Sequence, residues 1–207
     1  MTPRPPARIL GYFAKDAPIC IIFRRGPSRY TQMIRWRTDT DEFEPGQWIR
    51  GNVQGISMTR DGQYAALRIM GTRSRIDSWE DTQQAIVCKP PFFTALEAYI
   101  GGLCFTSAYF TEDNRLCTRG DKRVVNALNQ CPFERSDELR AGPEYGPRLG
   151  VVDATSGPAT GRDQAGRTIL LQDGRVFVVE AGKQRLLFDC NLYSFEAIAA
   201  PEWAMRW

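Results

Sequence analysis

The sequence predicts an all-β protein built as a propeller-like array of short antiparallel hairpins, with a β-sandwich as the alternative. Short apolar and β-branched runs recur along the chain of 207 residues, and turn dipeptides separate them in pairs. At most one or two short helices are expected, because few segments have helical spacing. The balance of 43% hydrophobic and 25% charged residues is ordinary for a globular protein. We therefore expect residues 1–207 to form a single domain.

The expected strands, taken in chain order, are runs in which apolar residues alternate with polar ones or follow one another briefly. The strongest runs are residues 19–23, 30–37, 52–58, 63–70, 106–110, 168–171, 175–179 and 184–188. Their lengths, about four to eight residues, are typical of strands in globular proteins.

Tight turns are expected at Asp61-Gly62, Asp113-Asn114 and Asp173-Gly174, because these residues tolerate the positive φ of a primed hairpin turn. A fourth turn is expected at Ala181-Gly182-Lys183. The three Asp-containing hairpins resemble one another and are 52 and 60 residues apart. Propeller blades recur at about 40 to 50 residues, so these intervals fit blades that carry insertions. Unrelated hairpins of a β-sandwich would give the same pattern.

Two segments have helical spacing. Residues 122–131 place apolar side chains at i, i+4 and i+7 after Asp121 as the N-cap, and residues 79–87 follow a capping-box pattern. The stretch 131–166 is rich in glycine and proline. It predicts a loop-rich insertion that is interrupted by a strand at 148–153.

Several short motifs are spread over nearly the whole chain. They are Arg24-Arg25-Gly26-Pro27-Ser28, Arg35-Trp36, Phe43-Glu44-Pro45-Gly46-Gln47-Trp48, the Asp61-Gly62 hairpin, Pro90-Pro91-Phe92-Phe93-Thr94-Ala95-Leu96 and Ala200-Pro201-Glu202-Trp203-Ala204. As a set they resemble an uncharacterised bacterial family. The Asp61-Gly62 hairpin is similar to the Ser-Pro-Asp-Gly hairpin of WD40-like, TolB-type propeller repeats, with Thr59-Arg60 in place of Ser-Pro. The resemblance implies one propeller-like domain and assigns no catalytic residue.

The sequence contains no histidine. This excludes a Ser-His-Asp triad, a Cys-His dyad and any His-ligated metal site, and it removes the usual general base near neutral pH. Neither a P-loop string nor a G-x-G-x-x-G string before a helix occurs. We therefore expect no enzymatic activity, no cofactor and no metal site.

The six cysteines include no C-x-x-C pair, so they do not indicate a zinc ribbon or a thioredoxin-like site. The apolar run 9–14 is shorter than the core of a signal peptide, and no run of about 18 apolar residues could span a membrane. We expect a cytoplasmic protein with reduced, mostly buried thiols that does not associate with a membrane.

Positive charge is concentrated in residues 1–37, which contain eight Lys or Arg and one Asp, although the net charge of the chain is only +3. Guanidinium groups there could bind phosphate or carboxylate, and Trp36 could stack on a base. The candidate anion-binding or partner-binding residues are Arg24, Arg25, Ser28, Arg29, Tyr30 and Trp36. The alternative is a solvated hairpin loop whose strand arginines point outward while Ile34 and Trp36 point inward.

Trp203 and Trp207 near the C-terminus are a second candidate partner-binding pair, since Trp is enriched in interface hot spots. The alternative is that this terminus docks back on the domain and completes the first blade. Taken together, the sequence predicts a non-enzymatic scaffold or accessory module of a cytoplasmic bacterial assembly whose partner is another protein. The alternative function is binding of nucleic acid or another acidic surface through residues 1–37.

Overall fold

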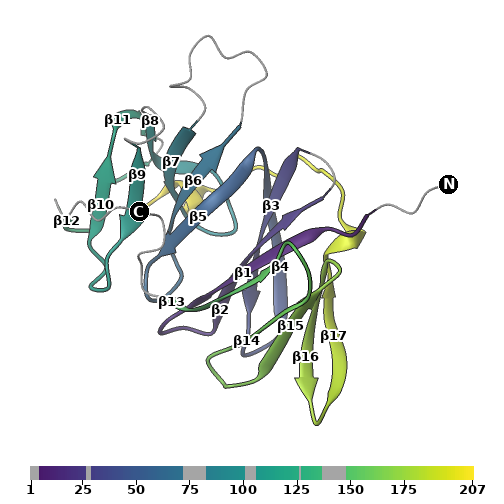
Figure 1. Ribbon diagram of the computed structural model, residues 1–207. Helices are drawn as coiled ribbons and strands as arrows, with labels where there is room; N and C mark the ends of the chain where they lie inside the picture. The colour runs from purple at the N-terminus through teal and green to yellow at the C-terminus, as the bar shows by residue number, and fades with distance from the viewer. Residues whose placement is uncertain (1–4, 27–28, 72–82, 101–105, 126, 137–147) are drawn as a thin grey trace.

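The computed structural model describes residues 5–26, 29–71, 83–100, 106–125, 127–136 and 148–207. Over these ranges the protein is all-β, with the strands arranged in four sheets and none of the sheets closed into a barrel (Figure 1). The expected all-β class is confirmed. Each of the eight predicted runs overlaps a strand, and no end differs by more than two residues.

The first sheet has the strand order β13-β1-β2-β3-β4, and all its neighbours are antiparallel. Its strands are β1 (Arg8–Ala14), β2 (Ile19–Arg25), β3 (Tyr30–Arg37), β4 (Glu42–Arg50) and β13 (Arg148–Ala154). Strand β13 comes from a distant part of the chain and pairs Val152 with Gly11 of β1. The first sheet is thus completed by a segment that the sequence places inside the expected insertion.

The second sheet has the order β11-β8-β7-β6-β5 and the third the order β12-β10-β9, while the fourth is a meander of β14 to β17. The second sheet contains β5 (Asn52–Met58), β6 (Ala65–Met70), β7 (Gln83–Cys88), β8 (Ala95–Ile100) and β11 (Asp121–Val125). The third contains β9 (Ser107–Phe110), β10 (Leu116–Arg119) and β12 (Arg135–Ser136). The fourth contains β14 (Ala159–Arg162), β15 (Thr168–Gln172), β16 (Arg175–Glu180) and β17 (Lys183–Asp189).

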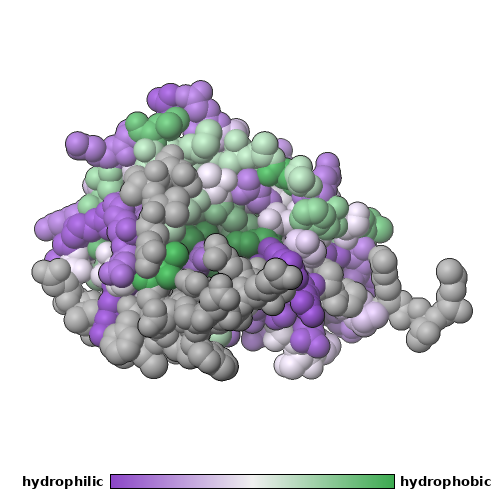
Figure 2. All heavy atoms as spheres, turned by 90° about the horizontal axis from the view of Figure 1, so that it is seen from above, coloured by the Kyte–Doolittle hydropathy of each residue, from purple (hydrophilic) through white to green (hydrophobic). Residues whose placement is uncertain are grey.

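The four sheets are stacked in the order fourth, first, second, third, from the lower right to the left of Figure 1. Side chains alternate along each strand, so the two inner sheets bury both faces. On β2, Ile21 and Phe23 pack toward the second sheet, whereas Cys20 and Ile22 pack toward the fourth. Fully burying one large apolar side chain contributes roughly 1.5–3 kcal/mol. Some hydrophobic residues also reach the surface near the middle of the molecule in the view from above (Figure 2).

Three turns share one hydrogen-bond pattern and begin 52 residues apart, at Thr59, Thr111 and Asp163. In each turn the carbonyl oxygen of the first residue accepts a hydrogen bond from the N–H three residues later. The side-chain oxygen of the same first residue accepts a hydrogen bond from the main-chain N–H of the residue that closes the turn. The residues at the fourth position, which have positive φ, are Gly62 (70°), Asn114 (62°) and Gly166 (76°). The third equivalent turn is therefore the one at Asp163, and the predicted equivalence of Asp173 with the other two is wrong.

The hairpin at Asp173-Gly174 has a two-residue turn with φ values of 49° and 74°, as predicted. The turn at Ala181-Gly182 has the same form. The turns at Asp61-Gly62 and Asp113-Asn114 differ, because only Gly62 and Asn114 have positive φ there. The difference arises because these loops are longer. In each of them the side-chain oxygen of the first residue accepts a hydrogen bond from the main-chain N–H of the residue that closes the turn.

Both predicted helices are wrong within the described residues. Residues 83–87 of the expected helix 79–87 lie in β7, and residues 122–125 of the expected helix 122–131 lie in β11. Strand β7 is buried on both faces, so its apolar run is continuous and cannot be distinguished from a buried helix by periodicity. The described helical turns are the short 3-10 helices η2 (Cys190–Leu192) and η3 (Glu202–Met205).

The strand expected at 148–153 is confirmed, but the surrounding stretch 131–166 also contributes β12 and β14. Residues 137–147 of this stretch lie outside the described part. No helix of the described residues is long and apolar enough to cross a membrane.

After β17 the chain forms a C-terminal tail, residues 190–207, that runs back across the sheets to the third one (yellow in Figure 1). The main-chain oxygens of Tyr193 and Ile198 accept hydrogen bonds from the first sheet, and Trp207 contacts Phe133 beside the third. The tail thus connects the two ends of the stack.

Candidate functional site

The basic residues singled out in the sequence meet at one end of the first sheet, where β1 begins, β2 ends and β3 begins. We call the surface formed here by Arg8, Arg25 and Arg29 the arginine end; Arg24 and Tyr30 lie at the same end but on the other face of the sheet. Strand register brings Arg8 of β1 directly opposite Arg25 of β2. Like charges opposite each other on neighbouring strands destabilise a sheet, so this pairing calls for a physical explanation.

Arg8 and Arg25 line a small pocket of about 240 Å³ together with Pro5, Pro6 and Gly26. No carboxylate of the described residues forms an ion pair with either arginine. Elsewhere the arginines of this protein usually have such partners, for example Arg60 with Asp16 at 2.5 Å. The two unpaired guanidinium groups make the small pocket suitable for an anion.

Arg24 lies on the opposite face of the first sheet, because neighbouring residues of a strand point to opposite sides. It is 8% exposed, and its guanidinium donates to the main-chain oxygens of Cys190 (3.1 Å) and Tyr193 (2.7 Å). The same group lies 4.8 Å from the ring centre of Trp48. Burial lowers the pKa of Arg24, and no carboxylate of the described residues is paired with it. Arg24 therefore anchors the tail while remaining a cation without a counter-charge among the residues that the structure describes.

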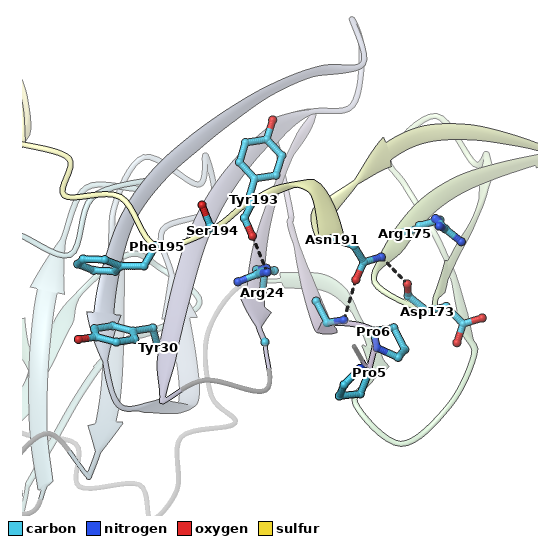
Figure 3. A pocket seen from close by; sticks show the side chains of 12 residues that line it. Pro5, Pro6, Arg24, Tyr30, Asp173, Arg175, Asn191, Tyr193, Ser194 and Phe195 are labelled. Atoms are coloured by element: carbon cyan, nitrogen blue, oxygen red, sulfur yellow. Dashed lines mark hydrogen bonds between the residues drawn. The ribbon is translucent and has the colours of Figure 1, made fainter. Parts of the chain in front are cut away.

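A larger pocket of about 700 Å³ opens beside Arg24 (Figure 3). On one side lie Tyr30 and Phe195, whose ring centres are 4.5 Å apart, and on the other lie Pro5 and Pro6. Phe195 is 53% exposed, which is unusual for a large apolar side chain. The pocket therefore combines a buried cation with an accessible aromatic wall.

Trp36 does not belong to this surface, and the expectation that it offers a stacking platform is wrong. Its exposure is 0%, and its ring stacks on Phe43 at 5.2 Å and contacts Phe13 at 6.0 Å. The inward direction follows from strand alternation, since Ile34 two residues earlier is also in the core. Ser28, another candidate, lies outside the described residues.

Trp203 and Trp207 dock back on the protein. The Trp203 ring is 5.4 Å from that of Phe92 and stays 42% exposed, and Trp207 lies 6.0 Å from the rings of Tyr64 and Phe133. The terminus adds no strand to the first sheet, so the idea that it completes the first blade is wrong. Its apolar side chains instead cover the second and third sheets.

Several of the sequence motifs meet at a single place, which the sequence alone did not reveal. The N–H of Gln47 donates to the oxygen of Pro91 (3.0 Å), its side-chain oxygen accepts from the N–H of Thr94 (3.0 Å), and its amide donates to Ile198 (2.9 Å). A Cβ built on Gly46 overlaps the carbonyl oxygen of Pro91. These motifs therefore join β4, the connection between β7 and β8, and the tail.

A second feature missed by sequence reasoning is a buried charge cluster at Glu97 of β8. Glu97 is 2% exposed and accepts hydrogen bonds from Arg135 at 2.7 and 2.8 Å, from Lys122 at 2.6 Å and from the hydroxyl of Tyr99. Burial acts to raise the pKa of Glu97, but the hydrogen bonds outweigh it and hold the pKa below its ordinary value. The cluster is fully paired and links the second sheet to the third.

The comparisons with known proteins add no relative. No family model, no curated protein and no solved structure matches the chain. The arginine end, defined by its geometry, is therefore the basis for the function inferred below.

Proposed function

We propose that the protein is a non-enzymatic interaction module of a cytoplasmic bacterial assembly, and that it holds an acidic segment of a partner protein at the arginine end. The observation that carries this proposal is the cross-strand pair Arg8 and Arg25, which have no carboxylate partner among the described residues. A bound carboxylate would turn this repulsive pair into an attractive one. Arg29, exposed at the start of β3, extends the positive surface.

The array of sheets supports a binding role. We propose that the four stacked sheets are an open, propeller-like arrangement, supported by their face-to-face packing and by the turn that recurs every 52 residues. A rigid array of this kind presents its loops and strand ends at fixed positions, which suits recognition of a partner. The resemblance to TolB-type hairpins agrees with this arrangement.

Nucleic acid bound through residues 1–37 is the second candidate. It is favoured by Arg8, Arg25 and Arg29, which have no carboxylate partner within the part of the chain that the structure describes, because phosphate contacts need no sequence-specific geometry. A protein partner is preferred because Trp36 is buried and cannot stack on a base.

The test is a fluorescence anisotropy titration with two labelled probes of equal charge, a peptide rich in Asp and Glu and a single-stranded DNA. The acidic peptide should bind more tightly, and its affinity should fall about tenfold or more between about 50 and about 200 mM salt. Arg25→Glu should abolish binding. The matched control Arg162→Glu reverses an exposed arginine on the edge strand β14 and should leave binding unchanged.

If the DNA binds more tightly than the peptide, the proposal of a protein partner is wrong and the partner is nucleic acid. If neither probe binds, or if Arg162→Glu weakens binding as much as Arg25→Glu does, the arginine end is not a recognition surface.

A further inference from the structure

We infer that the larger pocket beside Arg24 is a binding site for a small organic carboxylate, whose charged group pairs with Arg24 and whose apolar part lies against Tyr30 and Phe195. The proposed function rests instead on Arg8 and Arg25 on the other face of the first sheet, although Pro5, Pro6 and Gly26 line both pockets.

The first support is that Arg24 still has hydrogen-bond donors to offer. A guanidinium has five N–H groups, and Arg24 uses its Nε and one N–H of Nη2 for the main-chain oxygens of Cys190 and Tyr193. Nη1 lies 3.3 Å from the position that a Cβ on residue 26 would occupy. Since residue 26 is glycine, no methyl group covers Nη1. The Nη1 and Nη2 groups together can receive a carboxylate in a forked arrangement.

The second support is the charge of the pocket. The charged residues of the lining are Arg24, Arg175 and the carboxylate Asp173, which lies on the Pro6 side of the pocket, away from Arg24. Arg175 is already paired with Asp189 at 2.8 Å. Arg24 lacks such a partner among the described residues, although it is more than nine-tenths buried. A buried charge without a counter-charge is costly, so an anion of single charge would be stabilised here. One available guanidinium suits a carboxylate better than a phosphate dianion, which needs more donors.

The third support is the shape of the pocket. Its volume of about 700 Å³ lies within the range of small-molecule sites. Figure 3 shows Arg24 between the Tyr30 and Phe195 rings on one side and Pro5 and Pro6 on the other. An apolar group attached to the carboxylate would therefore cover Phe195, which is half exposed in the free protein.

Such a carboxylate has two sources, a free organic acid or the C-terminus of a peptide. The probes are therefore 3-phenylpropionate and a tetrapeptide ending in Phe, each compared with its amide by isothermal titration calorimetry. For a ligand of this size we expect a Kd of about 1 mM or tighter. Each amide should bind at least about tenfold more weakly, because it lacks the charge that pairs with Arg24. The probe that binds more tightly identifies the source of the carboxylate.

Two variants test the role of Arg24 separately from folding. Arg24→Gln removes the cation and also two contacts to the tail, so it lowers stability as well as binding. Gly26→Ala keeps every charge and places a methyl group over Nη1, so binding should fall about tenfold while the thermal midpoint stays close to that of the parent. Arg185→Gln, on β17 and away from the pocket lining, is the control with unchanged binding.

The inference is overturned if neither acid binds, if the amides bind as well as the acids, or if Gly26→Ala binds like the parent protein. Loss of acidic-peptide binding in Arg25→Glu with unchanged binding of 3-phenylpropionate would confirm that the two sites are separate.

Discussion

At the scale of single residues, the structure explains motif residues that the sequence leaves without a role. Gly46 sits where β4 crosses the connection between β7 and β8, and only a residue without Cβ fits against the oxygen of Pro91. Gln47 next to it uses its main chain and both side-chain atoms for hydrogen bonds. Such residues act in packing, so their presence in a motif does not mark a binding site.

Gly46→Ala should destabilise the protein by about 3 kcal/mol or more, because the added carbon would overlap the carbonyl group and the ring Cβ of Pro91, and neither of these can rotate away. The measurement is the free energy of unfolding in urea. Gly157→Ala is the matched control, since a Cβ there meets no atom within 4 Å, and it should change stability by less than about 1 kcal/mol. Equal stability of the two variants would show that the segment moves to accept the methyl group.

At the scale of elements, the contact between β8 of the second sheet and β12 of the third depends on paired charge as well as on apolar packing. Glu97 is enclosed by Arg135, Lys122 and Tyr99, and each of these donates a hydrogen bond to it. Its pKa is lower in the folded protein than in the unfolded chain, so the folded state binds its proton more weakly. The stability that Glu97 contributes is therefore present above the ordinary carboxylate pKa and is lost as the pH falls through the folded-state value.

Glu97→Gln should cost about 1–2 kcal/mol at neutral pH, because it removes the charge partner of Arg135 and Lys122, which are themselves partly exposed. The cost should begin to shrink as the pH falls below about 4, where the unfolded parent gains a proton at Glu97 that the folded parent does not yet bind, and it should disappear below the folded-state pKa. Urea unfolding of both proteins between about pH 3 and about pH 7 measures this. Glu112→Gln, which removes an exposed ion pair with Lys15, should change stability by less than about 1 kcal/mol at any pH. A cost for Glu97→Gln that does not depend on pH would contradict the assignment.

At the scale of the whole molecule, the tail joins sheets that are far apart in the stack. It starts beside the fourth sheet, is anchored by Arg24 of the first, and ends where Trp207 packs against Tyr64 and Phe133. The end of the tail is also fixed by hydrogen bonds, from Leu128 N–H to the Met205 oxygen and from Trp207 N–H to Asn129.

Deletion of residues 202–207 should loosen the third sheet and leave the fourth intact. Hydrogen exchange measured by NMR should show loss of amide protection at Leu128 and along β9 and β10, because Leu128 loses its main-chain partner and Phe133 loses the Trp207 ring. Protection in β15 and β16 should not change. An equal loss throughout the molecule would mean that the stack unfolds as one cooperative unit.

The sequence alone determined the all-β class, the positions of the strongest strands and the two-residue turns of the fourth sheet. These depend on local properties, namely side-chain alternation and residues that accept positive φ. Strand β7 was taken for part of a helix because a strand buried on both faces has no alternation to detect.

The tertiary structure decided everything that depends on strand register and on contacts between distant segments. Arg8 meets Arg25 because β1 pairs with β2 in one register, and a shift of one residue between these strands would put the two side chains on opposite faces. The pocket beside Arg24 exists because Tyr193 and Phe195, about 170 residues later in the chain, fold back over β2 and β3. The arginines were visible in the sequence, but which of them face one another, which are buried and which remain unpaired follow only from these long-range contacts.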